Sequence, residues 1–110
     1  RLTVLGCSMG GYAALEYCKH RPHEVSAVAI IAGYYDPGRL ELLVQEIGHI
    51  PLFAMHYRGD TTVPVHSVER LIALRQERSP AVTQSRILSG KNHCPDEKGR
   101  QKVLDWLQEH

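Results

Sequence analysis

The chain has 110 residues, of which 43% are hydrophobic and 23% are charged, the balance of one ordinary globular domain. Thirteen Lys and Arg residues against twelve Asp and Glu give a net charge of +1, and no basic stripe or polybasic run is present, which argues against a nucleic-acid or anionic-membrane partner. The longest apolar run, residues 25–32 with one serine, is far shorter than the roughly 20 residues of a membrane-spanning helix.

Short apolar runs alternate with amphipathic stretches along the chain. Four runs are expected to be strands: residues 2–5, 25–32, 51–56 and 82–88. The first three are apolar nearly throughout, which is typical of strands buried on both faces of a parallel sheet. The fourth is more polar and suits the edge of a sheet.

Helices are expected between and after these strands, over residues 9–20, 39–46, 64–77 and 96–109. Pro22 closes the first helix, because proline cannot continue one, and Pro64 suits a first helical turn. The last helix begins with acidic residues, as suits a helix N-terminus. Strand and helix in alternation predict an α/β fold with a parallel sheet and right-handed crossovers.

A G-x-S-x-G motif centred on Ser8 lies where the first strand turns into the first helix. This is the context of a nucleophile elbow, in which a strained backbone lifts a serine hydroxyl above the sheet. The tight turn brings Gly6 and Gly10 close together, so we expect that only glycine fits at either position, while Gly11 lets the helix lie near the sheet. The alternative is a glycine-rich turn that packs or binds phosphate.

Two further residues complete a possible catalytic set. A serine hydroxyl needs an imidazole to take its proton, and the imidazole needs a carboxylate to hold its tautomer. Such groups belong on loops at the carboxyl ends of parallel strands. Asp60 follows the third expected strand and His93 follows the fourth, so the chain order is Ser8, Asp60, His93.

With these three motifs in this order, the chain resembles the C-terminal half of the α/β-hydrolase superfamily. The H-x-x-x-D-x-x-V-P stretch from His56 to Pro64 and the short spacings resemble small serine esterases of the acyl-protein thioesterase, dienelactone hydrolase and prolyl oligopeptidase types. Tyr57 departs from the family pattern, H-G-x-x-D, which has glycine there. The resemblance implies a single partial domain over residues 1–110, with about four parallel strands.

The leading hypothesis is a serine hydrolase of carboxylic esters or thioesters that works through an acyl-enzyme. Ser8 would attack the acyl carbonyl, His93 would take and return the proton, Asp60 would orient His93, and the backbone N–H of Met9 would stabilise the oxyanion. No cofactor or metal is expected. The alternatives are a serine peptidase of the prolyl oligopeptidase type, and an inactive fragment or interaction module that kept the triad.

Other acidic residues compete with Asp60 for the place of triad acid. Asp36 follows the second strand, a position that some hydrolases use for this purpose. Asp96 is expected to cap the last helix, and Asp105 falls in the middle of it. Tyr34 and Tyr35 either line an acyl pocket or cover the edge of the core.

Several other histidines could suggest a metal site, but none pairs with a carboxylate at ligand spacing on one element, so we expect solvated or packing side chains. These are His20, His23, His49, His56 and His66.

The three cysteines are odd in number and lack the spacing of a metal site or a disulfide framework, which favours a reduced, cytoplasmic chain. Cys7 is expected to point away from the site into a small core position, and Cys94 to be a semi-exposed structural thiol. Cys18 has no expected role.

The chain enters a strand-like run directly after Arg1, so we expect it to be the C-terminal part of a longer protein. The preceding half would hold any targeting segment and, by the resemblance, the second oxyanion donor and the strand beside residues 2–5. Without it, that apolar edge invites self-association. We also expect one face of the sheet to leave side chains such as Val28, Ile30 and Phe53, or their alternating neighbours, in water.

Overall fold

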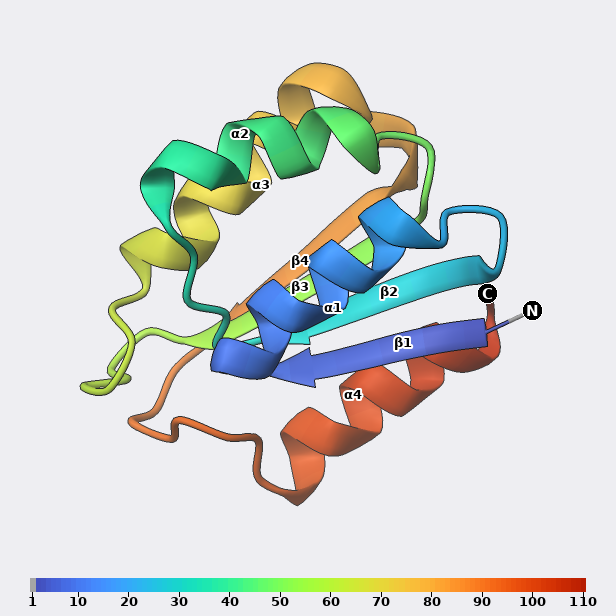
Figure 1. Ribbon diagram of the computed structural model, residues 1–110. Helices are drawn as coiled ribbons and strands as arrows, with labels where there is room; N and C mark the ends of the chain where they lie inside the picture. The colour runs from blue at the N-terminus through green and yellow to red at the C-terminus, as the bar shows by residue number, and fades with distance from the viewer. Residues whose placement is uncertain (1) are drawn as a thin grey trace.

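The computed structural model describes residues 2–110, which form a four-stranded sheet with helices on both faces (Figure 1). The elements in chain order are β1 (Leu2–Cys7), α1 (Met9–His20), β2 (Val25–Ile31), α2 (Pro37–Glu46), β3 (Leu52–Tyr57), α3 (His66–Arg78), a 3-10 turn (Pro80–Val82), β4 (Thr83–Leu88) and α4 (Glu97–Gln108). Every strand pairs in parallel, and the strand order is β1-β2-β3-β4. The predicted α/β fold, half of an α/β-hydrolase fold, is confirmed, and so is the polar β4 at an edge.

The residues just before each helix explain where α2, α3 and α4 begin. Asp36 caps α2, its carboxylate accepting a hydrogen bond from Gly38 N at 3.0 Å, and Asp96 caps α4 as predicted, accepting from Gly99 N at 2.9 Å. The third helix begins two residues later than predicted. Pro64 lies before it, in a tighter turn closed by a hydrogen bond from Ser67 N to the Pro64 carbonyl at 3.1 Å.

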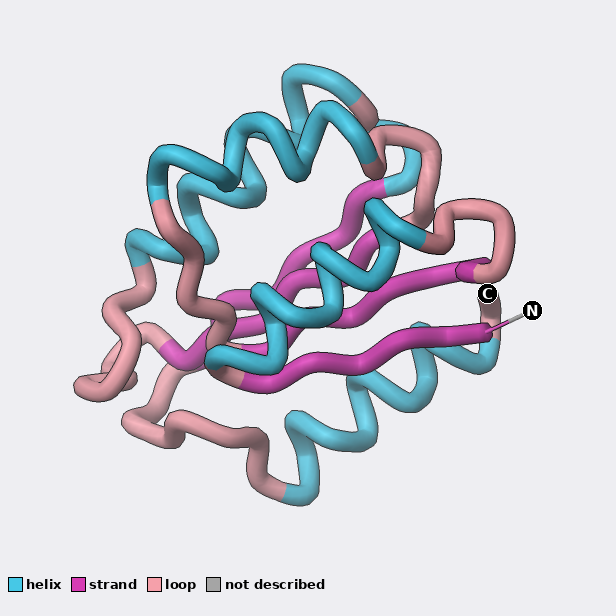
Figure 2. The backbone as a smooth tube through the Cα atoms, in the orientation of Figure 1, coloured by secondary structure: helices cyan, strands magenta, loops and turns pink. Residues whose placement is uncertain are grey.

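Two layers of helices enclose the sheet. The helices α1, α2 and α3 cover one face and α4 covers the other (Figure 2). On the α4 side, Trp106 stacks on Phe53 with ring centroids 5.5 Å apart, and Val103 joins the same cluster. The sheet therefore has a core on each face. Because the strands are parallel, the carboxyl ends of all four lie at the same end of the sheet.

The strands β2 and β3 are sealed on both faces, so one expectation is wrong. Val28 and Ile30 are fully buried in the core beneath α1, α2 and α3, and Phe53 is 3% exposed in the core beneath α4. Among the four strands, β1 is the one with exposed large apolar side chains, where Leu2 is 46% exposed and Leu5 is 52% exposed. Because these side chains are exposed, the interpretation of β1 as a strand buried on both faces is also wrong.

A buried arginine ties α3 to its neighbours. The Arg75 guanidinium donates to Thr83 Oγ1 at 2.9 Å and to the Ile50 carbonyl at 2.7 Å, with longer bonds to the carbonyls of Ile47, Gly48 and Val82. Burial lowers the pKa of Arg75 to about 10. The side chain thus satisfies backbone carbonyls at the start of β3 and β4.

Within residues 2–110, no helix combines the length and the apolar character that crossing a membrane requires. The same residues contain no group of three or more His, Cys, Asp or Glu placed to hold a metal ion.

Candidate functional site

Ser8 occupies a strained turn between β1 and α1. Its backbone has φ 60° and ψ −123°, and residues with a side chain rarely adopt such a positive φ. Two hydrogen bonds hold the turn: Ser8 N donates to the Ile31 carbonyl at 2.9 Å, and the Ser8 carbonyl accepts from Gly11 N at 2.9 Å. The residue is half-buried, and this geometry is that of a nucleophile elbow.

The glycines around Ser8 differ in what they provide. A Cβ on Gly6 would lie 2.2 Å from the Gly10 carbonyl oxygen, so the expectation for Gly6 is confirmed. The expectation for Gly10 is wrong, because a Cβ there meets nothing within 4 Å. A Cβ on Gly11 would lie 2.8 Å from Ile30 Cγ2, which confirms that this glycine lets α1 approach the sheet.

The Asp60 carboxylate is buried in the loop after β3 and fully hydrogen-bonded. One oxygen accepts from Thr62 N at 2.8 Å and Val63 N at 3.0 Å, and the other faces His93 Nδ1 at 2.8 Å. Burial raises the pKa of Asp60, but the hydrogen bonds from His93 and from the two backbone N–H groups outweigh it, so the net pKa lies below the ordinary value. Asp60 is therefore an anion that holds His93.

His93 lies in the loop after β4, and about a quarter of its side chain is exposed. An ionised carboxylate only accepts hydrogen bonds, so the contact with Asp60 places a proton on Nδ1. In the neutral ring Nε2 is then the free proton acceptor. This is the tautomer that a general base for a serine requires.

Backbone contacts fix the two loops side by side. Arg58 N donates to the Leu88 carbonyl and Gly59 N to the Gly90 carbonyl, each at 2.8 Å. A Cβ on Gly59 would lie 2.7 Å from the Gly90 oxygen, and Gly90 itself has φ 128°, a conformation that suits glycine. The pairing of β3 with β4 thus continues into the loops that carry Asp60 and His93.

His56 is a member of this cluster that the sequence reasoning missed. It is fully buried on β3, with Nε2 2.7 Å from the Val63 carbonyl and 3.6 Å from the second oxygen of Asp60. It is a packing histidine, as expected, but it packs against the acid. The sequence signal for this contact is the spacing H-x-x-x-D, which places His56 four residues before Asp60.

Tyr57, which stands where the family pattern has glycine, is held by hydrogen bonds to Asp96. Its hydroxyl donates to Asp96 Oδ1 at 2.7 Å and accepts from Asp96 N at 3.2 Å. Gly99 makes room for it, because a Cβ there would lie 2.3 Å from that hydroxyl. The side chain therefore ties the end of β3 to the start of α4, just beyond the loop of His93.

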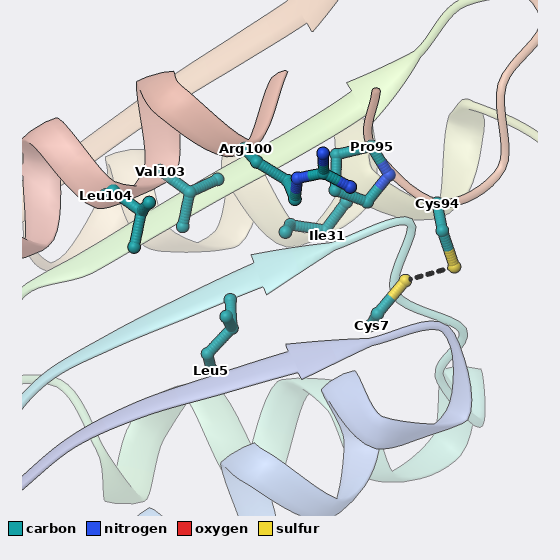
Figure 3. A pocket seen from close by; sticks show the side chains of 8 residues that line it. All are labelled: Leu5, Cys7, Ile31, Cys94, Pro95, Arg100, Val103 and Leu104. Atoms are coloured by element: carbon teal, nitrogen blue, oxygen red, sulfur yellow. Dashed lines mark hydrogen bonds between the residues drawn. The ribbon is translucent and has the colours of Figure 1, made fainter. Parts of the chain in front are cut away.

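The structure joins His93 to Asp60, and within residues 2–110 no hydrogen bond joins His93 to Ser8. The elbow and the His93 loop meet instead through their neighbours, because Cys7 Sγ lies 2.8 Å from Cys94 Sγ (Figure 3). Cys7 packs against the core on the α4 side, as expected, but it is only partly buried there. It lines a hollow of about 360 Å³ between β1 and α4.

Within residues 2–110, no hydrogen bond joins the remaining candidates to His93 or Asp60. Asp36 is occupied as the cap of α2, and Asp105 lies on α4, where it accepts from Gln101 at 2.7 Å. Tyr35 is buried in the core, whereas Tyr34 is exposed and lines a surface hollow beside Met9. Met9 is the first residue of α1, where backbone N–H groups lack intrahelical partners.

A family model describing esterases matches residues 1–109. Among solved structures, the chain is similar to a thermostable esterase (25% identity, TM-score 0.77), to Zea mays acyl-protein thioesterase 2 (18%, 0.80) and to esterase PE8 (23%, 0.80). These matches cover 99%, 99% and 97% of the chain, which spans only 30%, 55% and 49% of those proteins. No curated protein sequence matches it. With the half-fold, the match over nearly all its residues shows that this chain belongs to the Esterase family of the α/β-hydrolase superfamily.

Proposed function

We propose that the protein carrying this chain is a serine hydrolase of carboxylic esters or thioesters, with Ser8 as nucleophile, His93 as base and Asp60 as the orienting acid. The observation that carries the proposal is the 2.8 Å contact between His93 Nδ1 and the buried Asp60 carboxylate. Esterase family membership and the strained backbone of Ser8 support it.

The proposed reaction has two halves. Ser8 Oγ attacks the acyl carbon while His93 Nε2 takes the hydroxyl proton, and the alcohol or thiol leaves with that proton. Water then attacks the acyl-enzyme, giving its proton to Nε2, and the acid leaves as Ser8 is regenerated. Asp60 stays ionised throughout and stabilises the imidazolium.

The oxyanion of the tetrahedral intermediate needs backbone donors. We assign one to the N–H of Met9, the residue after the nucleophile and the first of α1. The resemblance implies a second donor from a loop outside this chain. The neighbouring hollow, which Met9, Tyr12, Ala13 and Tyr34 help to line, offers an apolar surface for a substrate group.

A fluorophosphonate probe tests the nucleophile in the protein that carries this chain. Labelling and hydrolysis of short p-nitrophenyl esters are expected, and Ser8→Ala should abolish labelling. Both Ser8→Ala and His93→Ala should lower kcat by roughly 10⁴- to 10⁶-fold, because triad members act as a unit. The matched control is Ser89→Ala, an exposed serine in the same loop as His93, which should keep full activity.

Two outcomes would overturn this proposal. Labelling that survives Ser8→Ala would place the nucleophile elsewhere. A folded wild-type protein that neither labels nor hydrolyses esters would favour the interaction module.

A further inference from the structure

Two cysteines far apart in the sequence meet beside the proposed catalytic residues. Cys7 and Cys94 are 87 positions apart, and their sulfur atoms are 2.8 Å apart. Cys7 directly precedes Ser8, and Cys94 directly follows His93. Both are free thiols, Cys94 exposed and Cys7 half-buried, and their side chains point at each other at one end of the hollow between β1 and α4 (Figure 3).

The distance is close to that of a covalent bond. A disulfide has a sulfur–sulfur distance of about 2.05 Å, so the two atoms need to approach by only about 0.8 Å. Cys7 is the last residue of β1, whereas Cys94 lies in the loop of residues 89–96, which contains no helix or strand. The loop can therefore supply the movement while the strand stays in place.

We propose that Cys7 and Cys94 form a reversible disulfide that tethers the nucleophile elbow to the loop carrying His93. The pair is a redox modification site, and a small-molecule disulfide such as glutathione disulfide is its oxidant. Cys18, the third cysteine, lies on α1, buried in the core on the other face of the sheet, and takes no part.

The exchange proceeds in two balanced steps. The exposed Cys94 thiolate attacks glutathione disulfide, forming a mixed disulfide and releasing one glutathione thiolate. Cys7 sulfur then attacks Cys94 sulfur, so that the bond to the second glutathione breaks and the Cys7 proton passes to the solvent. Two protein thiols become one disulfide, and glutathione disulfide is reduced to two glutathiones.

The order of attack follows from the surroundings of the two sulfurs. Burial, together with the hydrogen bond and charge of Cys94, raises the pKa of Cys7 to about 12, so Cys7 is a thiol at neutral pH and a poor first nucleophile. Two of these causes, the hydrogen bond and the charge of Cys94, disappear once Cys94 is bound to glutathione. Cys7 then becomes easier to deprotonate at the step where it must attack.

The effect on catalysis rests on the proposed function. Closing the sulfur–sulfur gap moves Cys94, which is bonded directly to His93, and fixes it to Cys7, which is bonded directly to Ser8. A misplacement of about 1 Å in a catalytic site can lower the rate by about 100-fold. We expect oxidation to lower kcat/KM at least about tenfold, and dithiothreitol to restore it.

The bond itself is tested without an activity assay. The protein carrying this chain is equilibrated with glutathione disulfide, alkylated, digested with trypsin and mapped by mass spectrometry. The expected product links peptide 2–19 to peptide 92–98 and disappears on reduction. Because peptide 2–19 contains both Cys7 and Cys18, the cross-link must persist in Cys18→Ala and vanish in Cys7→Ser and Cys94→Ser.

A folded protein that shows no such cross-link under excess glutathione disulfide, or one whose cross-link survives Cys7→Ser, would overturn the proposal. Circular dichroism confirms that each variant is folded.

Ester hydrolysis then tests the tether. Wild type should lose activity on oxidation, while Cys94→Ser, with unchanged basal activity, should be insensitive to glutathione disulfide. An oxidised wild type with unchanged kcat/KM would overturn the tethering effect. A protein that forms the cross-link but lacks esterase activity when reduced would contradict the proposed function without contradicting the disulfide. Failure of the proposed function is therefore distinguishable from failure of the disulfide proposal.

Discussion

At the scale of single residues, the buried carboxylate of Asp60 organises the site. It accepts two backbone N–H groups through one oxygen and His93 through the other. An amide in its place keeps the first oxygen but presents an NH₂ group to His93, which favours the wrong imidazole tautomer.

Asp60→Asn should therefore leave the fold intact and lower turnover by about 10⁴-fold, measured as kcat on p-nitrophenyl esters. The matched control is Asp36→Asn, at the competing acid. The Asp36 carboxylate caps α2 and, within residues 2–110, accepts a hydrogen bond only from Gly38 N. Because asparagine caps a helix as well as aspartate does, this variant should keep its activity. Loss of activity in Asp36→Asn, with activity retained in Asp60→Asn, would show that the triad acid is Asp36, after β2.

The same carboxylate makes stability depend on pH. The pKa of Asp60 is lowered in the folded state from 3.8, so its contribution to stability is fully present above that value and is lost as the pH falls through the folded pKa. The unfolding free energy of wild type should exceed that of Asp60→Asn at pH 7, and the difference should shrink as the pH falls below about 3.8. Urea titrations at a series of pH values measure it. A difference that does not change down to pH 2 would show that Asp60 contributes nothing through its charge.

At the scale of elements, the turn from β1 into α1 distinguishes its two glycines. Gly6 faces the Gly10 carbonyl across the elbow, whereas Gly10 faces open space in the first turn of α1. One position is constrained by a backbone contact and the other only by its helical conformation.

Gly6→Ala should distort the elbow, lowering both the melting temperature and kcat, with a cost of about 1–3 kcal/mol for the forced contact. Gly10→Ala should stabilise α1 by about 0.5–1 kcal/mol, because alanine loses less backbone entropy in a helix. Thermal unfolding of the two variants beside wild type measures the difference. Equal destabilisation by both substitutions would contradict this assignment.

At the scale of the whole molecule, β1 is the exposed edge of the sheet. Its Leu5 is half exposed over a hollow, and the backbone of an edge strand presents unpaired N–H and C=O groups. The cores on either side of β2 and β3 are closed, so β1 is the strand where exposed apolar side chains and unpaired backbone groups occur together.

Residues 1–110 expressed alone should therefore self-associate. They should also lack esterase activity, because the resemblance implies that the second oxyanion donor lies outside this chain. Size-exclusion chromatography with light scattering should show a mass above that of a monomer, and Leu5→Lys should shift the population toward monomer. The matched control is Leu42→Lys, a similarly exposed leucine on α2, which should leave association unchanged. A compact monomer that turns over esters at ordinary rates would contradict the expectation.

Much of this architecture was predictable from the sequence because it is local. Apolar runs and helical periodicity placed every strand and helix within a few residues, with the bounds of α1 correct at both ends. The elbow around Ser8 was recognisable because strand, turn and helix follow one another directly. Asp60 and His93 were candidates because each follows a strand, and parallel strands end at one edge.

The tertiary structure alone decided how distant residues meet. The contact between Cys7 and Cys94, the bond from Tyr57 to Asp96 and the carbonyls around Arg75 depend on strand order and on how helices cross the sheet. No local pattern encodes these contacts, because the periodicity of a segment sets which face is buried but not what covers it. For the same reason, the sequence could predict that β1 is apolar, while only the way the helices pack on the sheet determined that Leu2 and Leu5 face water.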